Sequence, residues 1–141
     1  MMRKRRPILA SLALALLLSG CHGPASEAEM EEQVEIVHTN VNKLATYFGN
    51  DIAVILDDVI GCDVEIGDPT EEVSYLLTIP IDRTTFEAVV KQLPAHYPSP
   101  EWRISTEPDD ITFRKDDLLM SATFRPRRDE VSIYGTTGCR R

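Results

Sequence analysis

The sequence predicts an α+β fold, in which one or two N-terminal helices and one further helix pack on an antiparallel β-sheet that ends in a C-terminal meander. Near the start of the chain, apolar residues recur at steps of three and four, which is typical of one face of a helix. Later stretches alternate between apolar and polar residues and are separated by turn-forming residues, as in consecutive half-buried strands. Helices and strands that are segregated along the chain favour α+β architecture.

The first predicted helix begins with the acidic segment near the start of the chain. Ser26 and Glu29 match a capping box, and Gly49 ends the helix. The apolar stripe of this helix consists of Met30, Val34, Val37, Val41, Leu44 and Phe48. Residues 52–60 fit a helical face but are also rich in β-branched side chains. We interpret them as a short second helix that ends at Gly61.

The centre of the chain predicts two strands. Residues 62–66 form the first, and residues 67–69 form a turn after it. Strict alternation of apolar residues from Val73 to Ile81 predicts the second strand, with one face buried. Because Pro80 has no N–H, we expect this end of the strand to lie at a sheet edge.

A further helix and the meander follow. Asp82 or Thr84 caps the helix, and its apolar face consists of Phe86, Val89, Val90 and Leu93. The predicted strands of the meander are residues 101–106, a strand that begins at Ile111, residues 118–124, and a strand that begins at Val131. Charged turns at residues 115–117 and 126–129 separate the last three.

The first twenty residues have the layout of a secretory signal. A cationic segment at residues 3–6 precedes an apolar run at residues 8–18. A helix over this run rises about 16 Å, whereas the hydrocarbon core of a membrane is about 30 Å thick. The run is therefore too short for a membrane span. Arg5 and Arg6 also resemble a twin-arginine export signal.

The end of this signal, Leu18-Ser19-Gly20-Cys21, resembles the lipobox of bacterial lipoproteins. The resemblance implies that Cys21 carries diacylglycerol and is the N-terminus of the mature protein, which is held at the extracytoplasmic face of the cell membrane by its acyl chains. The division of the chain is then a signal peptide (1–20), a lipidated tether (21–26) and a single α+β domain (27–141). The alternative is an ordinary cleaved signal, with Cys21 as a disulfide partner.

Three cysteines are an odd number for an exported chain. If Cys21 carries the lipid, Cys62 and Cys139 remain as a pair in a compartment that permits disulfides. A bond between them would close a loop of about 78 residues, which is worth about 4 kcal/mol in the chain-entropy model. The alternative is two free or metal-binding thiols, although no CxxC motif supports a metal site.

The charge of the chain argues against two classes of partner, nucleic acid and anionic lipid surfaces. The net charge of −8 becomes −12 when the four cations of residues 3–6 are removed with the signal. Such a chain is a poor ligand for nucleic acid or for anionic lipid surfaces. Residues 21–110 carry 4 basic and 19 acidic side chains, and residues 111–141 carry 7 and 4. This asymmetry is either a solvated surface or an acidic face for a basic partner.

The mature part also resembles small exported or lipid-anchored domains of actinobacteria. Trp102, the meander and the ending Thr136-Thr137-Gly138-Cys139 carry this resemblance. It supports the fold and the location, because most such domains have no known activity.

No catalytic motif is present in the sequence. There is no G-x-S-x-G elbow, and the glycines near the C-terminus do not open a helix as a phosphate loop does. We therefore predict no enzymatic activity, metal or cofactor, and expect a binding or assembly module with a protein partner at the cell surface. The alternatives are a small-ligand or solute-binding lipoprotein, with a pocket at His96, Tyr97 and Trp102, and an envelope hydrolase.

Overall fold

The structure is a computed structural model that describes residues 27–61 and 71–138. It contains two α-helices, one 3-10 helix and six strands in these residues. In chain order they are α1 (Glu27–Thr46), β1 (Ala53–Gly61), β2 (Glu71–Pro80), α2 (Arg83–Gln92), η1 (Leu93–His96), β3 (Arg103–Glu107), β4 (Asp110–Lys115), β5 (Leu118–Arg125) and β6 (Glu130–Thr136).

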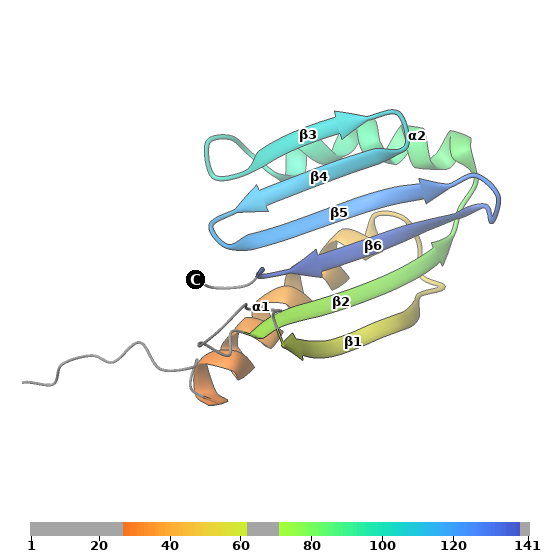
Figure 1. Cartoon of the computed structure of the whole chain (residues 1–141). Coiled ribbons are helices and arrows are strands. Elements are labelled where there is room, and N and C mark those ends of the chain that lie inside the picture. The colour runs from red at the N-terminus through yellow and green to blue at the C-terminus, as the bar shows by residue number, and fades with distance from the viewer. Residues whose placement is uncertain (1–26, 62–70, 139–141) are drawn as a thin grey trace, which may run out of the picture.

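All six strands belong to one antiparallel sheet with the order β1-β2-β6-β5-β4-β3 (Figure 1). The predicted α+β class and antiparallel sheet are confirmed. The C-terminal meander is also confirmed, because β3, β4, β5 and β6 are joined by successive hairpin turns and pair in sequence order. β6 pairs with β2, so the hydrogen bonds between these two strands join the β1–β2 pair and the meander into a single sheet.

The predicted short helix at residues 52–60 is wrong, because these residues form β1. Val54 pairs with Leu77 and Val59 pairs with Val73, and one irregularity between Val54 and Leu56 interrupts the register. The periodicity of this segment fits both a helix and a strand. Its β-branched side chains favour the strand, and pairing with β2 stabilises the strand further. The predicted strand at 62–66 and the turn at 67–69 lie outside the described residues.

The predicted strand from Val73 to Ile81 is found as β2, but it does not lie at an edge. β2 is interior, between β1 and β6. Pro80 is tolerated there because the pairing with β1 stops at Thr78, opposite Ala53, before the proline is reached. Pro80 itself is opposite Glu130 of β6.

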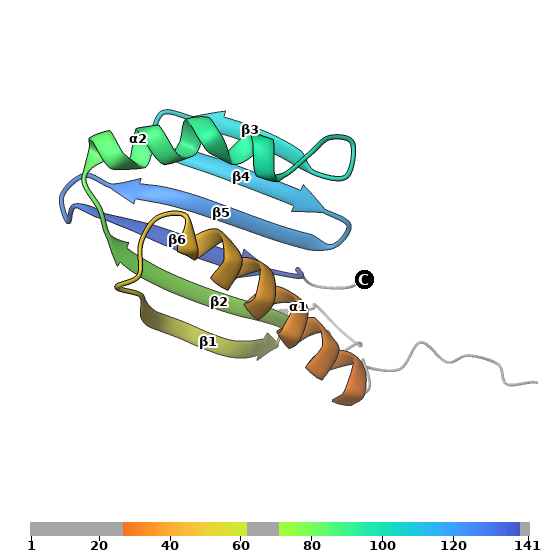
Figure 2. The same ribbon diagram turned by 180° about the vertical axis from the view of Figure 1, so that it is seen from behind.

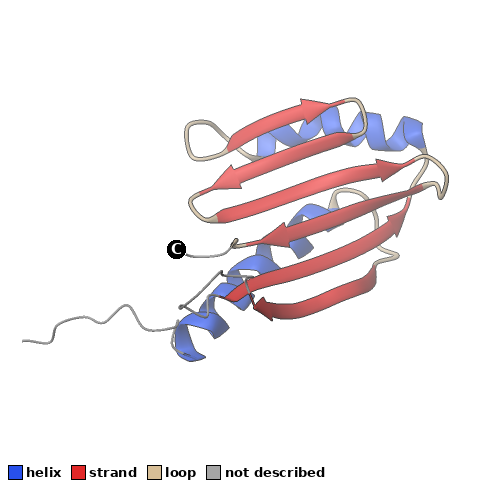
Figure 3. Cartoon of the chain, in the orientation of Figure 1, coloured by secondary structure: helices blue, strands red, loops and turns tan. Residues whose placement is uncertain are grey.

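Both helices lie on the same side of the sheet (Figure 2), and the other side is seen without a described helix in Figure 3. The apolar stripe predicted for the first helix is confirmed by Val37, Val41 and Leu44, which are fully buried. The stripe packs on β6 at Gly135, whose missing side chain leaves room for Val41. The predicted capping residue Ser26 lies outside the described residues.

Asp82, one of the two capping residues that the sequence predicts, is the N-cap of α2. Its Oδ1 accepts a hydrogen bond of 2.7 Å from the Thr85 N–H. This hydrogen bond lowers the pKa of the Asp82 carboxyl below its ordinary value. The cap orients the first turn so that Phe86 is buried between Phe48 and Phe124, at ring-centroid distances of 5.8 and 5.3 Å.

Candidate functional site

The residues predicted to bind a ligand lie in and beside an aromatic cluster of the core. Tyr97 and Trp102 are 2% and 9% exposed, and their rings meet edge to face at 5.1 Å. Phe113 lies 4.6 Å from Tyr97 and fills the space between the rings and the sheet. His96 is exposed, and its ring packs at a tilt against the ring of Tyr47, at a centroid distance of 4.8 Å. The structure thus packs Tyr97 and Trp102 against each other, whereas the His96 ring lies against Tyr47, and ligand binding there stays a prediction.

Tyr97 has an unusual environment for a phenol. Its hydroxyl is buried and has no hydrogen-bond partner among the described residues. Burial raises the pKa of the Tyr97 phenol, because the phenolate would lose its hydration. A buried hydroxyl without a partner costs about 1–3 kcal/mol.

We therefore expect Tyr97→Phe to raise the free energy of unfolding by about 1 kcal/mol. The raised pKa also gives a pH dependence. The folded state is favoured while Tyr97 is neutral, and this contribution is lost as the pH rises from the ordinary tyrosine pKa, about 10, toward the higher folded value. The Phe variant should lose less stability than the wild type in this alkaline range. Urea unfolding at neutral and alkaline pH measures both effects. A Phe variant less stable than the wild type at neutral pH would contradict the first, and an equal loss of stability at alkaline pH would contradict the second.

The three cysteines with predicted roles, Cys21, Cys62 and Cys139, lie outside the described residues. Within the residues that the structure describes, no group of three or more His, Cys, Asp and Glu side chains is placed to hold a metal ion. None of the helices in residues 27–61 and 71–138 is both long and apolar enough to cross a bilayer.

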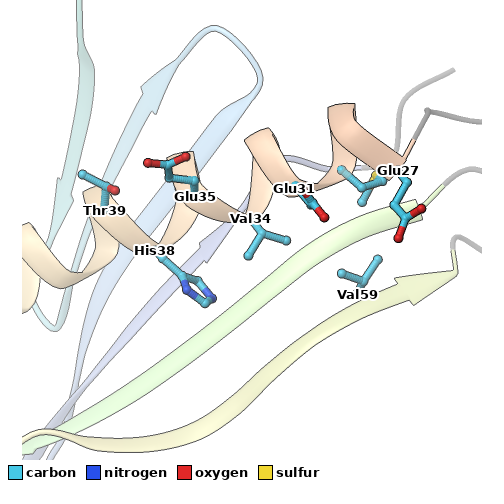
Figure 4. A pocket seen from close by; sticks show the side chains of 8 residues that line it. Glu27, Glu31, Val34, Glu35, His38, Thr39 and Val59 are labelled. Carbon is cyan, nitrogen blue, oxygen red and sulfur yellow. The ribbon is translucent and has the colours of Figure 1, made fainter.

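A groove between α1 and β1 is the strongest candidate for a binding site (Figure 4). It lies on the helix side of the sheet, has a volume of about 500 Å³ and is open to solvent. Its apolar lining comes from Met30 and Val34 of α1 and from Val59 of β1. Val34 and Val59 face each other across the groove in Figure 4. The groove exists because α1 packs mainly on β2 and β6 and leaves much of the inner face of β1 uncovered.

The wall of the groove that α1 provides is acidic. Glu27, Glu31 and Glu35 line it at successive turns of the helix, and all three side chains are exposed. Asp57, on the helix side of β1, adds a further carboxylate beside this wall, where it contacts His38 of α1. Surface carboxylates gathered in one concave site raise the local concentration of cationic groups.

One polar contact joins the two walls of the groove. The Nε2 of His38 in α1 lies 2.7 Å from the Oδ1 of Asp57, and the imidazole ring packs at a tilt against the ring of Tyr75, at a centroid distance of 4.1 Å. Tyr75 in turn donates a hydrogen bond of 3.1 Å to Asn42. These contacts tie β1 to the helix at one end of the groove and hold its width.

Exposed apolar side chains are frequent along residues 52–60, which include the strand that forms the other wall, and Val59 is the one of them that lines the groove. Of the six large apolar residues that are exposed in the described part of the chain, five lie in residues 52–60: Ile52, Val54, Ile55, Val59 and Ile60. Val54 and Ile55 are 58% and 59% exposed. Clustered exposed apolar residues, unlike scattered ones, mark surfaces that bind partners.

The opposite edge of the sheet has a different character. β3 is shorter than β1 and carries Arg103, Ser105 and Glu107 on its outer positions, with Ile104 turned to the core. The open face of the sheet is rich in hydroxyls that bind their neighbours. For example, Thr123 donates a hydrogen bond of 2.6 Å to Asp110, which also accepts one from Thr112. Neither surface offers the apolar and acidic combination of the groove.

Sequence reasoning missed this groove, although part of its signal was present. The acidic segment and the Asp57–Asp58 pair are visible in the sequence. With residues 52–60 assigned to a helix, however, nothing placed these carboxylates next to one another. The β-branched residues of that segment were the signal for a strand there.

Comparison of the chain with family models, curated proteins and solved structures gives no match.

Proposed function

We propose that this protein is a lipid-anchored, exported, non-catalytic module that binds a protein partner in the groove between α1 and β1. The observation that carries the proposal is an open groove with an acidic wall from α1 and an apolar lining of Met30, Val34 and Val59, at an edge strand along which further exposed apolar residues lie. An exposed apolar patch rimmed by charged residues is typical of a protein-binding surface.

The lipid anchor at Cys21 is the second part of the proposal. It rests on the lipobox-like residues Leu18 to Cys21 and on the signal before them. The tether joins α1 at its N-terminal end, where Glu27 and Glu31 begin the groove. A protein held in this way would present the groove to partners near the membrane surface.

Cys21→Ala should abolish lipid labelling and release the protein from the membrane fraction or leave its signal uncut. The physical reason is that acyl chains supply the membrane affinity of a chain whose net charge is negative. Metabolic labelling with a fatty acid analogue, followed by fractionation, measures both. Labelling that persists in the variant would show that the anchor is not Cys21.

A disulfide between Cys62 and Cys139 is also part of the proposal. Gly61 is the last residue of β1, and Gly138 follows the end of β6. Both strands run antiparallel to β2, which lies between them, so they end at the same end of the sheet. Two strand spacings, about 10 Å, separate these ends, and because the Cα atoms of a disulfide lie about 4–7 Å apart, the chain beyond the two strands has to converge for the bond to form. The cysteines are the next residues along the chain in each case.

Site-specific photocrosslinking in intact cells tests the groove as a binding surface. A benzophenone amino acid at Thr39, which lines the groove and carries no charge, should give a discrete adduct. The same amino acid at Ala88, which is exposed on α2, is the control. An adduct from Ala88 alone, or none from Thr39, would overturn the proposed function.

A further inference from the structure

We infer that the partner contributes an extended, basic segment that joins the sheet as a seventh strand beside β1. This inference rests on the proposed function of the groove and adds the conformation and the charge of the partner. Addition of a strand to a free sheet edge is an established mode of peptide recognition, in which main-chain hydrogen bonds give affinity and alternate side chains give specificity.

The free edge of β1 suits such an addition. β1 pairs with β2 on one side and with no described strand on the other. At nine residues it is long for an edge strand, and such strands are usually short or covered. Beyond the irregularity near Val54, pairing with β2 is regular from Leu56 to Gly61. A partner strand would therefore find a regular template over this part of β1.

The backbone of Val59 shows where the free edge is blocked. Its N–H donates a hydrogen bond of 2.8 Å to the Asp58 Oδ1, so this carboxylate occupies the donor. A carboxylate that binds an edge N–H protects the strand from casual pairing. A partner strand has to displace the Asp58 side chain, and a cation on the partner would hold the displaced carboxylate.

The negative charge around β1 favours a basic partner over a second copy of this chain. In a pair of β1 strands from two copies, Asp57 and Asp58 in the middle of each strand would approach carboxylates of the other, and like charges across strands are destabilising. The Glu31 and Glu35 side chains that line the groove add to this repulsion. The same groups attract lysine and arginine side chains.

The alternation of side chains along β1 predicts which side chains of the partner would face the groove. Asp57 and Val59 are opposite Tyr75 and Val73, which are buried on the helix side of the sheet. Alternate residues of an added strand would also point to this side and enter the groove. Long basic side chains at these positions would reach Glu31 and Glu35 of α1, and their methylene stems would cover the apolar lining.

A synthetic peptide of alternating lysine and valine, about eight residues long, is the probe. With the full chain in a neutral detergent, we expect a dissociation constant below about 1 mM, and weaker binding at high salt. A peptide of the same composition with all lysines before all valines has the charge without the alternation. It should bind at least about tenfold more weakly, and a peptide with glutamate for lysine should not bind.

Two sets of variants separate strand addition from simple attraction. Val59→Pro removes the edge N–H and should weaken binding at least about tenfold, whereas Val59→Ala, which keeps the N–H, should weaken it less than about threefold. Glu31→Lys with Glu35→Lys should weaken binding about tenfold. Glu32→Lys is the matched control, since Glu32 is exposed on the same helix but does not line the groove. The fluorescence of Trp102 confirms that each variant is folded.

The outcomes distinguish this inference from the proposed function. Wild-type affinity in Val59→Pro, or equal affinity for the two basic peptides, overturns strand addition, although loss in the Glu31 and Glu35 variant would still support the groove. Absence of binding by the alternating peptide also overturns the inference. The proposed function fails independently, when the crosslinker at Thr39 gives no adduct.

Discussion

Replacing Phe113 by alanine is expected to lower the free energy of unfolding by about 3–5 kcal/mol. Phe113 is fully buried in β4 and supports the rings of Tyr97 and Trp102 from the sheet side. Removal of the ring leaves a cavity that neighbouring strands cannot close, because β4 is paired on both sides. A domain of this size is stable by about 5–15 kcal/mol, so the loss is a large part of the total.

Urea unfolding followed by the fluorescence of Trp102 measures this loss. Trp102 is the single tryptophan of the chain and lies in the same cluster, with a centroid distance of 6.5 Å to Phe113. Phe113→Leu, which retains most of the apolar volume, is the control and should lose less than half as much. An alanine variant as stable as the wild type would show that the cluster does not support the core.

Replacing Gly135 by alanine is expected to cost about 1–3 kcal/mol, although only a methyl group is added. A Cβ at this position would lie 2.1 Å from the Val41 Cγ2 and 3.3 Å from the Val37 Cγ1. Both valines are fully buried and stiff at their β-carbon. Helix α1 therefore has to move away from β6, or its valines have to leave their preferred rotamers. Thermal or urea unfolding measures the cost.

A second variant, Val41→Ala, tests this cause. Val41→Ala alone destabilises by removing buried methyl groups, but it also vacates the space that the methyl group added by Gly135→Ala would need. The double variant should be less destabilised than the sum of the single ones by about 1 kcal/mol. Strict additivity would mean that contact between Gly135 and Val41 does not position α1.

Much of the fold could be predicted because local patterns and tertiary packing agree. The stripe through Val37 and Val41, the alternation in β2 and the capping residue Asp82 each describe one element by its own residues. The charged turns between the last strands also fall where predicted, since Asp116 and Asp129 adopt left-handed backbone conformations with φ of 51° and 46°.

The rest depended on contacts between distant segments. Residues 53–61 form a strand because β2 pairs with them, and their own periodicity does not decide between helix and strand. The groove follows from that pairing and from the place where α1 crosses the sheet, neither of which is written in a local pattern. The aromatic residues that suggested a pocket, Tyr97 and Trp102, are buried by Phe113, which is distant from Tyr97 in the sequence.

Amide hydrogen exchange with and without the alternating lysine–valine peptide tests the central claim most directly. The two edge strands of the same sheet, β1 and β3, give an internal comparison. If a basic strand adds beside β1, exchange should slow at residues 56–60 and remain unchanged in β3. Slower exchange in β3 alone, or unchanged exchange in β1 at saturating peptide, would contradict the claim that the edge and groove at α1 and β1 are the binding surface.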